Sequence, residues 1–216
     1  MANAVPSNGR VALIAGATSE LGLATALALR ATGTTVVAVG TDWDRLMDVA
    51  ANHHYLCDLS DPQAVAELAD SIHAEVGPVD GLIHLVGGWR AGHDDESWQW
   101  LESRLLTTLR NTTSVFRDDL VASSAGRLAI VSSTSVDRPS WANANYSAAK
   151  AAAEAWVSAV ASGWAKAGKA AAVIFVIRAM GTTEGYTRAE TLATRIAALW
   201  DTPAAELNGS RINVLY

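Results

Sequence analysis

The chain has 216 residues, of which 50% are hydrophobic and 18% charged, and its formal net charge is −6. This balance excludes a disordered chain, and the negative charge argues against a nucleic-acid partner, because phosphate binding needs a surplus of basic side chains. No apolar run reaches the roughly 18 residues of a membrane-spanning helix, and the single cysteine, Cys57, excludes an intrachain disulfide. We therefore expect one compact domain, residues 1–216, in the cytoplasm and away from membranes.

Short apolar runs alternate with stretches of helical periodicity along the chain. In chain order, we expect strands at 10–15, 34–39, 55–57, 81–86, 127–132, 171–177 and 211–215, and helices at 21–31, 44–52, 62–75, 146–167 and 188–200, with a longer segment from 87 through 120. Almost uniformly apolar strands joined by long crossovers are typical of a parallel sheet with helices on both faces. The sequence therefore predicts a doubly wound α/β fold (Rossmann fold) of about seven strands, with its ligand at the carboxyl ends of the strands.

A glycine-containing turn follows the first predicted strand and opens the first helix. Its candidate dinucleotide-binding residues are Gly16, Thr18, Ser19, Glu20, Leu21 and Gly22. Glycines permit the tight turn and close packing, and the amides of a helix N-terminus favour a pyrophosphate. Such glycines also occur at purely structural helix entries, so the turn alone leaves both interpretations open.

The ends of the second and third strands bear on which dinucleotide is bound. Small or hydroxyl-bearing residues, Gly40 and Thr41, end the second strand, the first acid, Asp42, comes late, and Arg45 is near. An acid at this place would bind a ribose 2′-hydroxyl and repel a 2′-phosphate, so the pattern favours NADP, with NAD as the alternative. Asp58 is a candidate for the adenine amino group or for capping the next helix.

Tyr146 and Lys150 are four residues apart in a predicted helix and so share one face. A nearby ammonium favours the phenolate, and this pairing suits proton transfer if it lowers the tyrosine pKa. A surface pair would give the same spacing, so corroboration is needed. Ser133 comes thirteen residues earlier, just past the fifth strand, where its hydroxyl is able to hold a carbonyl oxygen.

Ser133, Tyr146 and Lys150, together with the glycine turn, resemble the short-chain dehydrogenase/reductase family. The resemblance extends to Asn111, which falls on the family's fourth catalytic residue, and to the closing segment 207–214. It implies hydride transfer between a nicotinamide cofactor and a carbonyl or alcohol, with Tyr146 moving the proton and Ser133 orienting the oxygen. It also implies that Lys150 binds the nicotinamide ribose and that Asn111 holds a relay water. The further cofactor contacts it implies are Asp58, Leu59, Val86, Gly87, Lys150, Met180 and Gly181.

Several residues depart from the family pattern. Glu20 replaces a glycine, which places a carboxylate near the pyrophosphate. His84-Leu85-Val86 stands where asparagines and an alanine are usual, and we interpret His84 as a polar residue satisfied at a strand end. Met180-Gly181 replaces Pro-Gly, and the substrate lid is shortened to residues 182–187. We expect an open cleft and intact catalytic residues.

The loop 87–92 resembles, over this short stretch, the glycine-and-tryptophan loop of dihydropteridine reductases in the same family. Candidate substrate-binding residues are Gly88, Trp89 and Trp141, with ring stacking or ordinary packing as the alternatives for the tryptophans. Ketones, pterins, quinones and acyl thioesters are the substrates considered. His53, His54 and Cys57 lack a second ligand pair, so we assign no metal.

A second hypothesis is a regulator that keeps the fold and senses a dinucleotide without turnover; Glu20 and the short lid motivate it. In the family that the chain resembles, helices corresponding to 103–125 and 146–167 commonly pair between subunits, so we expect a homotetramer or homodimer.

Overall fold

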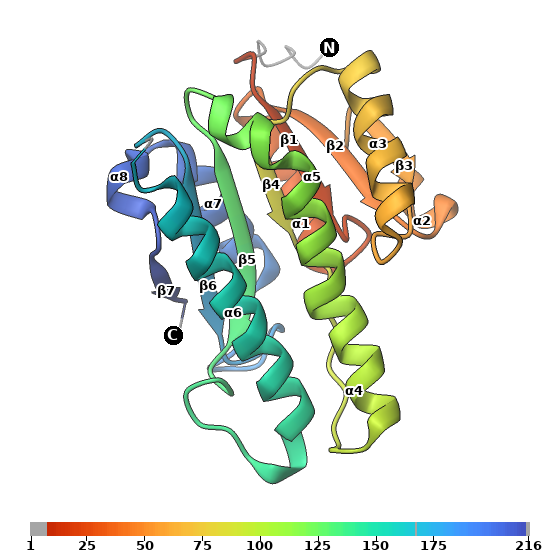
Figure 1. The fold of residues 1–216 in the computed structure, drawn as a ribbon, viewed down its shortest axis with the longest axis vertical. Helices are drawn as coiled ribbons and strands as arrows, with labels where there is room; N and C mark the ends of the chain where they lie inside the picture. The colour runs from red at the N-terminus through yellow and green to blue at the C-terminus, as the bar shows by residue number, and fades with distance from the viewer. Residues whose placement is uncertain (1–7, 167, 215–216) are drawn as a thin grey trace.

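The computed structural model describes residues 8–166 and 168–214. Residues 167 and 215, which the sequence analysis assigned to a helix and a strand, lie outside this range. The sheet consists of β1 (Val11–Ala15), β2 (Thr35–Gly40), β3 (His53–Leu56), β4 (Gly81–His84), β5 (Arg127–Ser133), β6 (Ala171–Ile177) and β7 (Arg211–Asn213). Its order is β3-β2-β1-β4-β5-β6-β7 and all its strand pairs are parallel. The predicted doubly wound fold is confirmed (Figure 1).

Helices cover both faces of the sheet. One face packs against α3 (Pro62–Glu75), α5 (Thr108–Ala122) and α6 (Ala144–Trp164), and the other against α1 (Glu20–Ala31), α2 (Trp43–Met47), α7 (Ala189–Ala197) and α8 (Ala204–Leu207). Alternate residues of β1 serve the two faces: Leu13 joins the first core and Ile14 the second. Both side chains are fully buried. This double coverage explains why the strands are apolar throughout.

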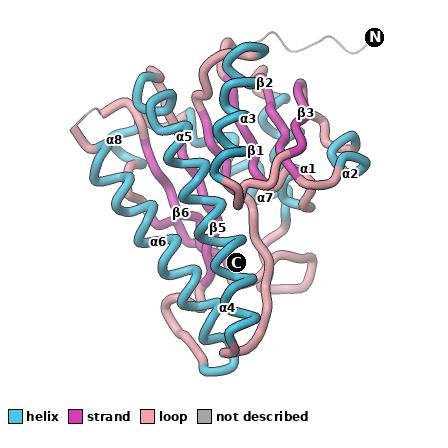
Figure 2. The backbone as a smooth tube through the Cα atoms, turned by 45° about the vertical axis from the view of Figure 1, so that its right-hand side comes forward, coloured by secondary structure: helices cyan, strands magenta, loops and turns pink. Residues whose placement is uncertain are grey.

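One helical run extends beyond the carboxyl edge of the sheet. It consists of α4 (Asp95–Glu102), the π-helical turn η1 (Ser103–Thr107) and α5, and the tube view shows α4 below the strands beside α6 (Figure 2). Leu101 and Leu105 of this run pack against Ala149 of α6, with Trp100 and Tyr146 at the border. The run therefore forms a wall beside the candidate site. No helix in the described part of the chain is long and apolar enough to cross a membrane.

Some predicted boundaries differ from the structure. The helix predicted over 44–52 ends at Met47, and Asn52 instead accepts a hydrogen bond from the Val36 amide at 2.9 Å through its side chain. The strand predicted over 81–86 ends at His84, because the chain then leaves the sheet to border the site. The predicted end helix 188–200 is split into α7 and the 3₁₀ turn η3 (Ala198–Trp200).

Candidate active site

The turn after β1 is built for close backbone packing. Ser19 caps α1 by accepting a hydrogen bond from the Gly22 amide at 3.0 Å. Gly16 has φ +79°, and a Cβ there would lie 2.8 Å from the Val86 amide; a Cβ at Gly22 would lie 2.3 Å from the Ala17 carbonyl oxygen. Both positions therefore require glycine. The turn lies directly against the β4 loop, as a backbone cradle for a phosphate group requires.

Two cavities lie at the carboxyl edge of the sheet and share Ser19, Leu85, Val86 and Gly87. The large cavity, about 1360 Å³, extends past β5 and β6. The small cavity, about 510 Å³, lies between the ends of β2 and β3 and the helical run. Their continuity fits an extended two-part ligand such as a dinucleotide, with one half in each cavity.

Most of the predicted cofactor-binding residues line these cavities. Glu20, Leu21, Lys150 and Met180 line the large cavity; Gly16, Thr18, Gly40, Thr41, Asp58 and Leu59 line the small one; Ser19, Val86 and Gly87 line both. Gly22 and Gly181 do not line either cavity. Gly22 packs against the Ala17 backbone. Gly181 has φ +150°, and a Cβ added at this position would lie 3.2 Å from the Tyr186 ring. We interpret these two glycines as shaping the walls.

The acids near the small cavity are occupied by local hydrogen bonds. Asp42 caps α2 by accepting from the Arg45 amide at 3.2 Å. Asp58 accepts from the Ser60 amide and hydroxyl, at 2.9 and 2.7 Å, and these hydrogen bonds lower its pKa. The helix cap considered for Asp58 belongs instead to Asp61. The Arg45 guanidinium lines the cavity, held by a 2.9 Å hydrogen bond to the Thr18 carbonyl.

Ser133, Tyr146 and Lys150 meet in the large cavity. Ser133 is the last residue of β5, Tyr146 lies in the first turn of α6, and Lys150 follows one turn later. The Lys150 ammonium nitrogen is 5.9 Å from the centre of the Tyr146 ring and donates to the Val131 carbonyl at 2.7 Å. Burial lowers the pKa of Lys150 to about 8, while the charge of Glu154 acts in the opposite direction. The three side chains that the sequence singled out are thus brought together.

The tyrosine pKa differs from the prediction. Burial raises the pKa of Tyr146, and the hydrogen bond with Ser133, not the charge of Lys150, acts to lower it. The reason is geometric, because the ammonium bonds the Val131 carbonyl and lies over the ring. The Tyr146 hydroxyl is therefore protonated at neutral pH in this structure and is ready to donate.

The predicted relay residue, Asn111, has other partners. Its side-chain amide donates to the carbonyls of Leu59 and Ser60 at 3.0 and 3.1 Å, so this side chain is tied to the loop after β3 and not to Lys150. Thr108, one turn earlier in α5, lines the small cavity instead. Asn111 comes three residues after Thr108 in α5, and the carbonyls of the loop after β3 hold its side-chain amide there.

Thr108 pairs with His84, a residue that we interpreted only as satisfied at a strand end. The His84 Nε2 atom is 3.1 Å from the Thr108 hydroxyl, which itself donates to the Arg104 carbonyl at 2.6 Å. His84 therefore donates from Nε2. It is 4% exposed and lines the large cavity with Lys150. Burial, followed by the charge of Lys150, lowers the pKa of His84 to about 3.

Because the His84 imidazole is buried and neutral, we expect the fold to be less stable in acid. The pKa of His84 is lower in the folded chain than the roughly 6.5 of a free histidine. The contribution of neutral His84 to the free energy of unfolding is therefore complete above about pH 6.5 and is lost as the pH falls toward about 3. We expect the free energy of unfolding to fall by about 2 kcal/mol between about pH 7 and 5 through this residue. Urea unfolding of His84→Asn across this range should show a flatter dependence than the parent chain.

His93→Asn is the matched control, since His93 is exposed and stacks on Trp141 with ring centres 4.4 Å apart. It should keep the acid slope of the parent. Equal slopes for the parent chain and His84→Asn would contradict a neutral buried imidazole.

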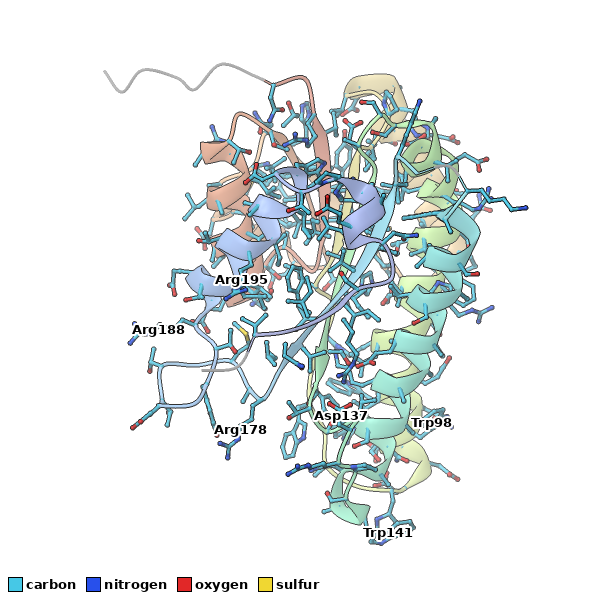
Figure 3. The ribbon with its side chains drawn as sticks, turned by 90° about the vertical axis from the view of Figure 1, so that its left-hand side faces the viewer. Trp98, Asp137, Trp141, Arg178, Arg188 and Arg195 are labelled. Carbon is cyan, nitrogen blue, oxygen red and sulfur yellow. The ribbon has the colours of Figure 1, made fainter. Side chains whose placement is uncertain are left out.

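The two substrate-binding tryptophans have different surroundings. Trp89 is 63% exposed and lines the large cavity together with Gly88, as expected. Trp141 is 73% exposed, is not among the residues lining that cavity, and stacks on His93 at the far tip of the molecule (Figure 3). The substrate role predicted for Trp141 is therefore not supported. Its stacking partner belongs to a distant segment, which the sequence does not reveal.

Sequence reasoning missed several cavity residues on the helical run, among them Ser103 and Arg104. Trp100, Ser103 and Arg104 line the small cavity, and the Arg104 guanidinium carbon lies 4.8 Å from the centre of the Trp100 ring. The sequence analysis assigned Asn111 of this run to the site but not Ser103 or Arg104, because the run was predicted only as one long segment. Within residues 8–166 and 168–214, no cluster of three or more histidine, cysteine or acidic side chains suits a metal ion.

Comparison with known proteins identifies the family. A family model described as short chain dehydrogenase matches residues 10–198. An uncharacterized oxidoreductase of Staphylococcus haemolyticus (strain JCSC1435) is 30% identical over 155 residues, covering 67% of each chain. The 2,3-dihydro-2,3-dihydroxybenzoate dehydrogenase of Bacillus subtilis (strain 168) is 29% identical over 163 residues, or 70% of this chain and 62% of that relative. The match therefore spans less than two thirds of the Bacillus protein. The chain belongs to the short chain dehydrogenase family, and the resemblance seen in the sequence is confirmed.

Solved structures share the fold over almost the whole chain. An NADPH-bound short chain oxidoreductase of Pseudomonas aeruginosa PAO1, described as containing an atypical catalytic center, has a TM-score of 0.88 at 19% identity and covers 97% of this chain and 96% of that chain. A gluconate 5-dehydrogenase from Burkholderia cenocepacia J2315, in complex with NADP and tartrate, has a TM-score of 0.82 at 20% identity and covers 97% and 94% of the two chains. At such identities the likeness concerns the fold.

Proposed function

We propose that the chain is a nicotinamide-dependent oxidoreductase that interconverts a carbonyl compound and its alcohol. The meeting of Ser133, Tyr146 and Lys150 in one cavity, beside the glycine turn, carries this proposal. A bound nicotinamide dinucleotide would supply the hydride. Its nicotinamide half belongs in the large cavity with Met180 and Lys150, and its adenosine half in the small one with Asp58 and Leu59.

Each catalytic side chain has one task in this reaction. Tyr146, kept protonated by burial, gives its proton to the carbonyl oxygen during reduction. Ser133 hydrogen-bonds Tyr146 and is placed to orient the same oxygen. The Lys150 ammonium, fixed on the Val131 carbonyl, binds the ribose and keeps positive charge beside the ring. Thr108 and His84 continue the polar path from Lys150 toward the small cavity, in the place first proposed for Asn111.

The test is turnover of reduced dinucleotide with a panel of ketones, quinones, pterins and acyl thioesters. Substrate-dependent loss of the reduced nicotinamide absorbance supports the oxidoreductase. Tight dinucleotide binding without turnover of any class supports instead the regulator that senses a dinucleotide.

We further propose that NADP is the preferred cofactor, with NAD as the alternative. The support is the charge of the small cavity. Arg45, Arg104 and Asp58 line it, but Asp58 is occupied by hydrogen bonds from Ser60, and Asp42, just after β2, caps α2. A guanidinium beside the adenosine ribose is suited to bind a 2′-phosphate, whereas a free carboxylate there would repel that phosphate.

Arg45→Gln should therefore weaken NADPH binding by about tenfold and NADH binding by less than about twofold. Fluorescence titration of the two reduced dinucleotides measures both effects. Arg110→Gln is the matched control, because Arg110 stacks on Trp156 and lies outside both cavities. Tighter binding of NADH than NADPH by the parent chain would reverse the preference.

A homo-oligomer, tetramer or dimer, and a cytoplasmic location complete the proposal. A shallow groove between α5 and α6, lined by Trp156, Val160 and Trp164, supports pairing of these helices between subunits. Light scattering at several protein concentrations tests the oligomer.

A further inference from the structure

Two arginines without an anionic side-chain partner in the described part of the chain line the large cavity. Arg178 directly follows β6, and its neighbour Ile177 is the register partner of Ser133 in the sheet. The Thr134 amide also donates to the Ile177 carbonyl at 3.0 Å. Arg138 comes five residues after Ser133, in the turn that leaves β5. Both cations therefore belong to the end of the cavity that holds Ser133 and Tyr146.

The acid in the same wall is already neutralised. Asp137 forms an ion pair with Arg211 at 3.0 Å, and Arg211 also binds Glu154 at 2.8 Å. Glu154 is in turn the acid that acts on the buried Lys150. Two carboxylates are thus matched by Arg211 and Lys150, and neither is an ion-pair partner of Arg138 or Arg178.

Glu20 is the remaining acid in the cavity lining, and it belongs to the other end. It begins α1 after β1, and β1 is separated from β6 by β4 and β5 in the sheet. Parallel strands lie about 4.8 Å apart, so the ends of β1 and β6 are about 14 Å apart. Among the acids that line the cavity in the described part of the chain, none therefore pairs with Arg138 or Arg178 beside Ser133.

Arg178 lies beside the aromatic ring of Tyr186. Its guanidinium carbon lies 5.9 Å from the centre of the Tyr186 ring, which lines the same cavity. The Tyr186 segment is closed by backbone hydrogen bonds from the Gly181 amide to the Thr187 carbonyl, 3.1 Å, and from the Thr187 amide to the Ala179 carbonyl, 2.9 Å. Figure 3 shows Arg178 and Asp137 on different elements at a similar height, away from Trp141 at the tip. A guanidinium has a planar shape that matches a carboxylate, so Arg178 is suited to bind a planar anion.

We propose that Arg178, assisted by Arg138, binds a carboxylate of the substrate, which is therefore an oxo acid or the corresponding hydroxy acid. This inference rests on the proposed oxidoreductase function, and it adds the substrate class. The reacting carbonyl lies at Ser133 and Tyr146, and the carboxylate reaches toward β6. Trp89, Ile177 and Met180 supply apolar surface for the body of the molecule. Because Arg178 is exposed, salt weakens the attraction.

The test compares oxo acids of increasing length, benzoylformate among them, each with its methyl ester and with NADPH as reductant. The parent chain should have the lower KM for the acid of at least one pair. Arg178→Gln should raise that KM by about tenfold and change the KM of the ester by less than about twofold, with Arg138→Gln giving a smaller change of the same kind. Arg195→Gln is the matched control, since Arg195 is an exposed residue of α7 outside the cavity.

Calorimetric titration of the same acids into the chain, with NADPH present, separates the two proposals. Acid binding that weakens in Arg178→Gln and in high salt supports the carboxylate site, even when no acid is turned over. Reduction of neutral ketones without measurable acid binding supports the proposed function and overturns the carboxylate site. Equal KM values for acid and ester in every pair also overturn it, as does an unchanged acid KM in Arg178→Gln and Arg138→Gln.

Discussion

Tyr146→Phe is expected to lower kcat by about 10² to 10⁴ and to leave the Kd for NADPH within about twofold of the parent value. The change removes only the hydroxyl that donates the proton, while the ring keeps its contact with Lys150 and its packing beside Leu101 and Leu105. Since burial raises the pKa of this hydroxyl, reduction by the parent chain should keep its rate through neutral pH. Oxidation of the alcohol needs the phenolate and should become faster as the pH rises.

Single-turnover reduction of the best ketone from the panel measures this effect, and fluorescence titration confirms that the variant still binds NADPH. Tyr55→Phe is the matched control: Tyr55 lies on the edge strand β3, bonds Glu75 at 2.6 Å, and is far along the sheet from β5. If Tyr146→Phe kept the kcat of the parent chain, another group would have to donate the proton, and the buried pair of His84 and Thr108 would be the first candidate.

The fold could be predicted from the sequence because its signals are local. The strand predicted at Ala171–Ile177 has the observed bounds, since a run of apolar residues ends where the sheet ends. The helix Pro62–Glu75 is likewise confirmed, because Asp61 caps it and proline favours its first position. The helix predicted over 44–52 has the wrong end, because Asn52 bonds Val36 of the neighbouring strand, a contact that the local pattern does not indicate.

The site could be predicted only in part, for the same reason. Ser133, Tyr146 and Lys150 were found because two of them share a helix face and the third ends a strand. Asn111 was assigned by its place in a motif, but the carbonyls of Leu59 and Ser60, which are distant in the sequence, hold its side-chain amide, and Thr108 lines the site. The surplus charge of Arg178 was also invisible in the sequence. It depends on which acids Arg211 neutralises, and Arg211 is far in the chain from both Asp137 and Glu154.

Lys150→Met should abolish turnover and at the same time stabilise the fold. Burial lowers the pKa of this ammonium to about 8, below the roughly 10.5 of a free lysine. Above about pH 10.5 the side chain is neutral in both states and does not lower the free energy of unfolding. As the pH falls from about 10.5 to about 8, the unfolded chain binds the proton first, so the free energy of unfolding decreases. At neutral pH the charged side chain therefore costs folding free energy, about 3 kcal/mol from this difference. Losing the hydrogen bond to the Val131 carbonyl offsets about 1 kcal/mol of the gain.

We therefore expect the free energy of unfolding of Lys150→Met at about pH 7 to exceed that of the parent by about 1 to 2 kcal/mol, with kcat lower by at least about 10². Urea unfolding measures the first, and turnover with NADPH the second. Lys169→Met controls for charge, because Lys169 is exposed and should change neither quantity. An inactive variant that is also more stable cannot owe its inactivity to unfolding, so this pair of results assigns Lys150 to the reaction. A variant that is less stable than the parent would show instead that the ammonium is needed to hold β5 against α6.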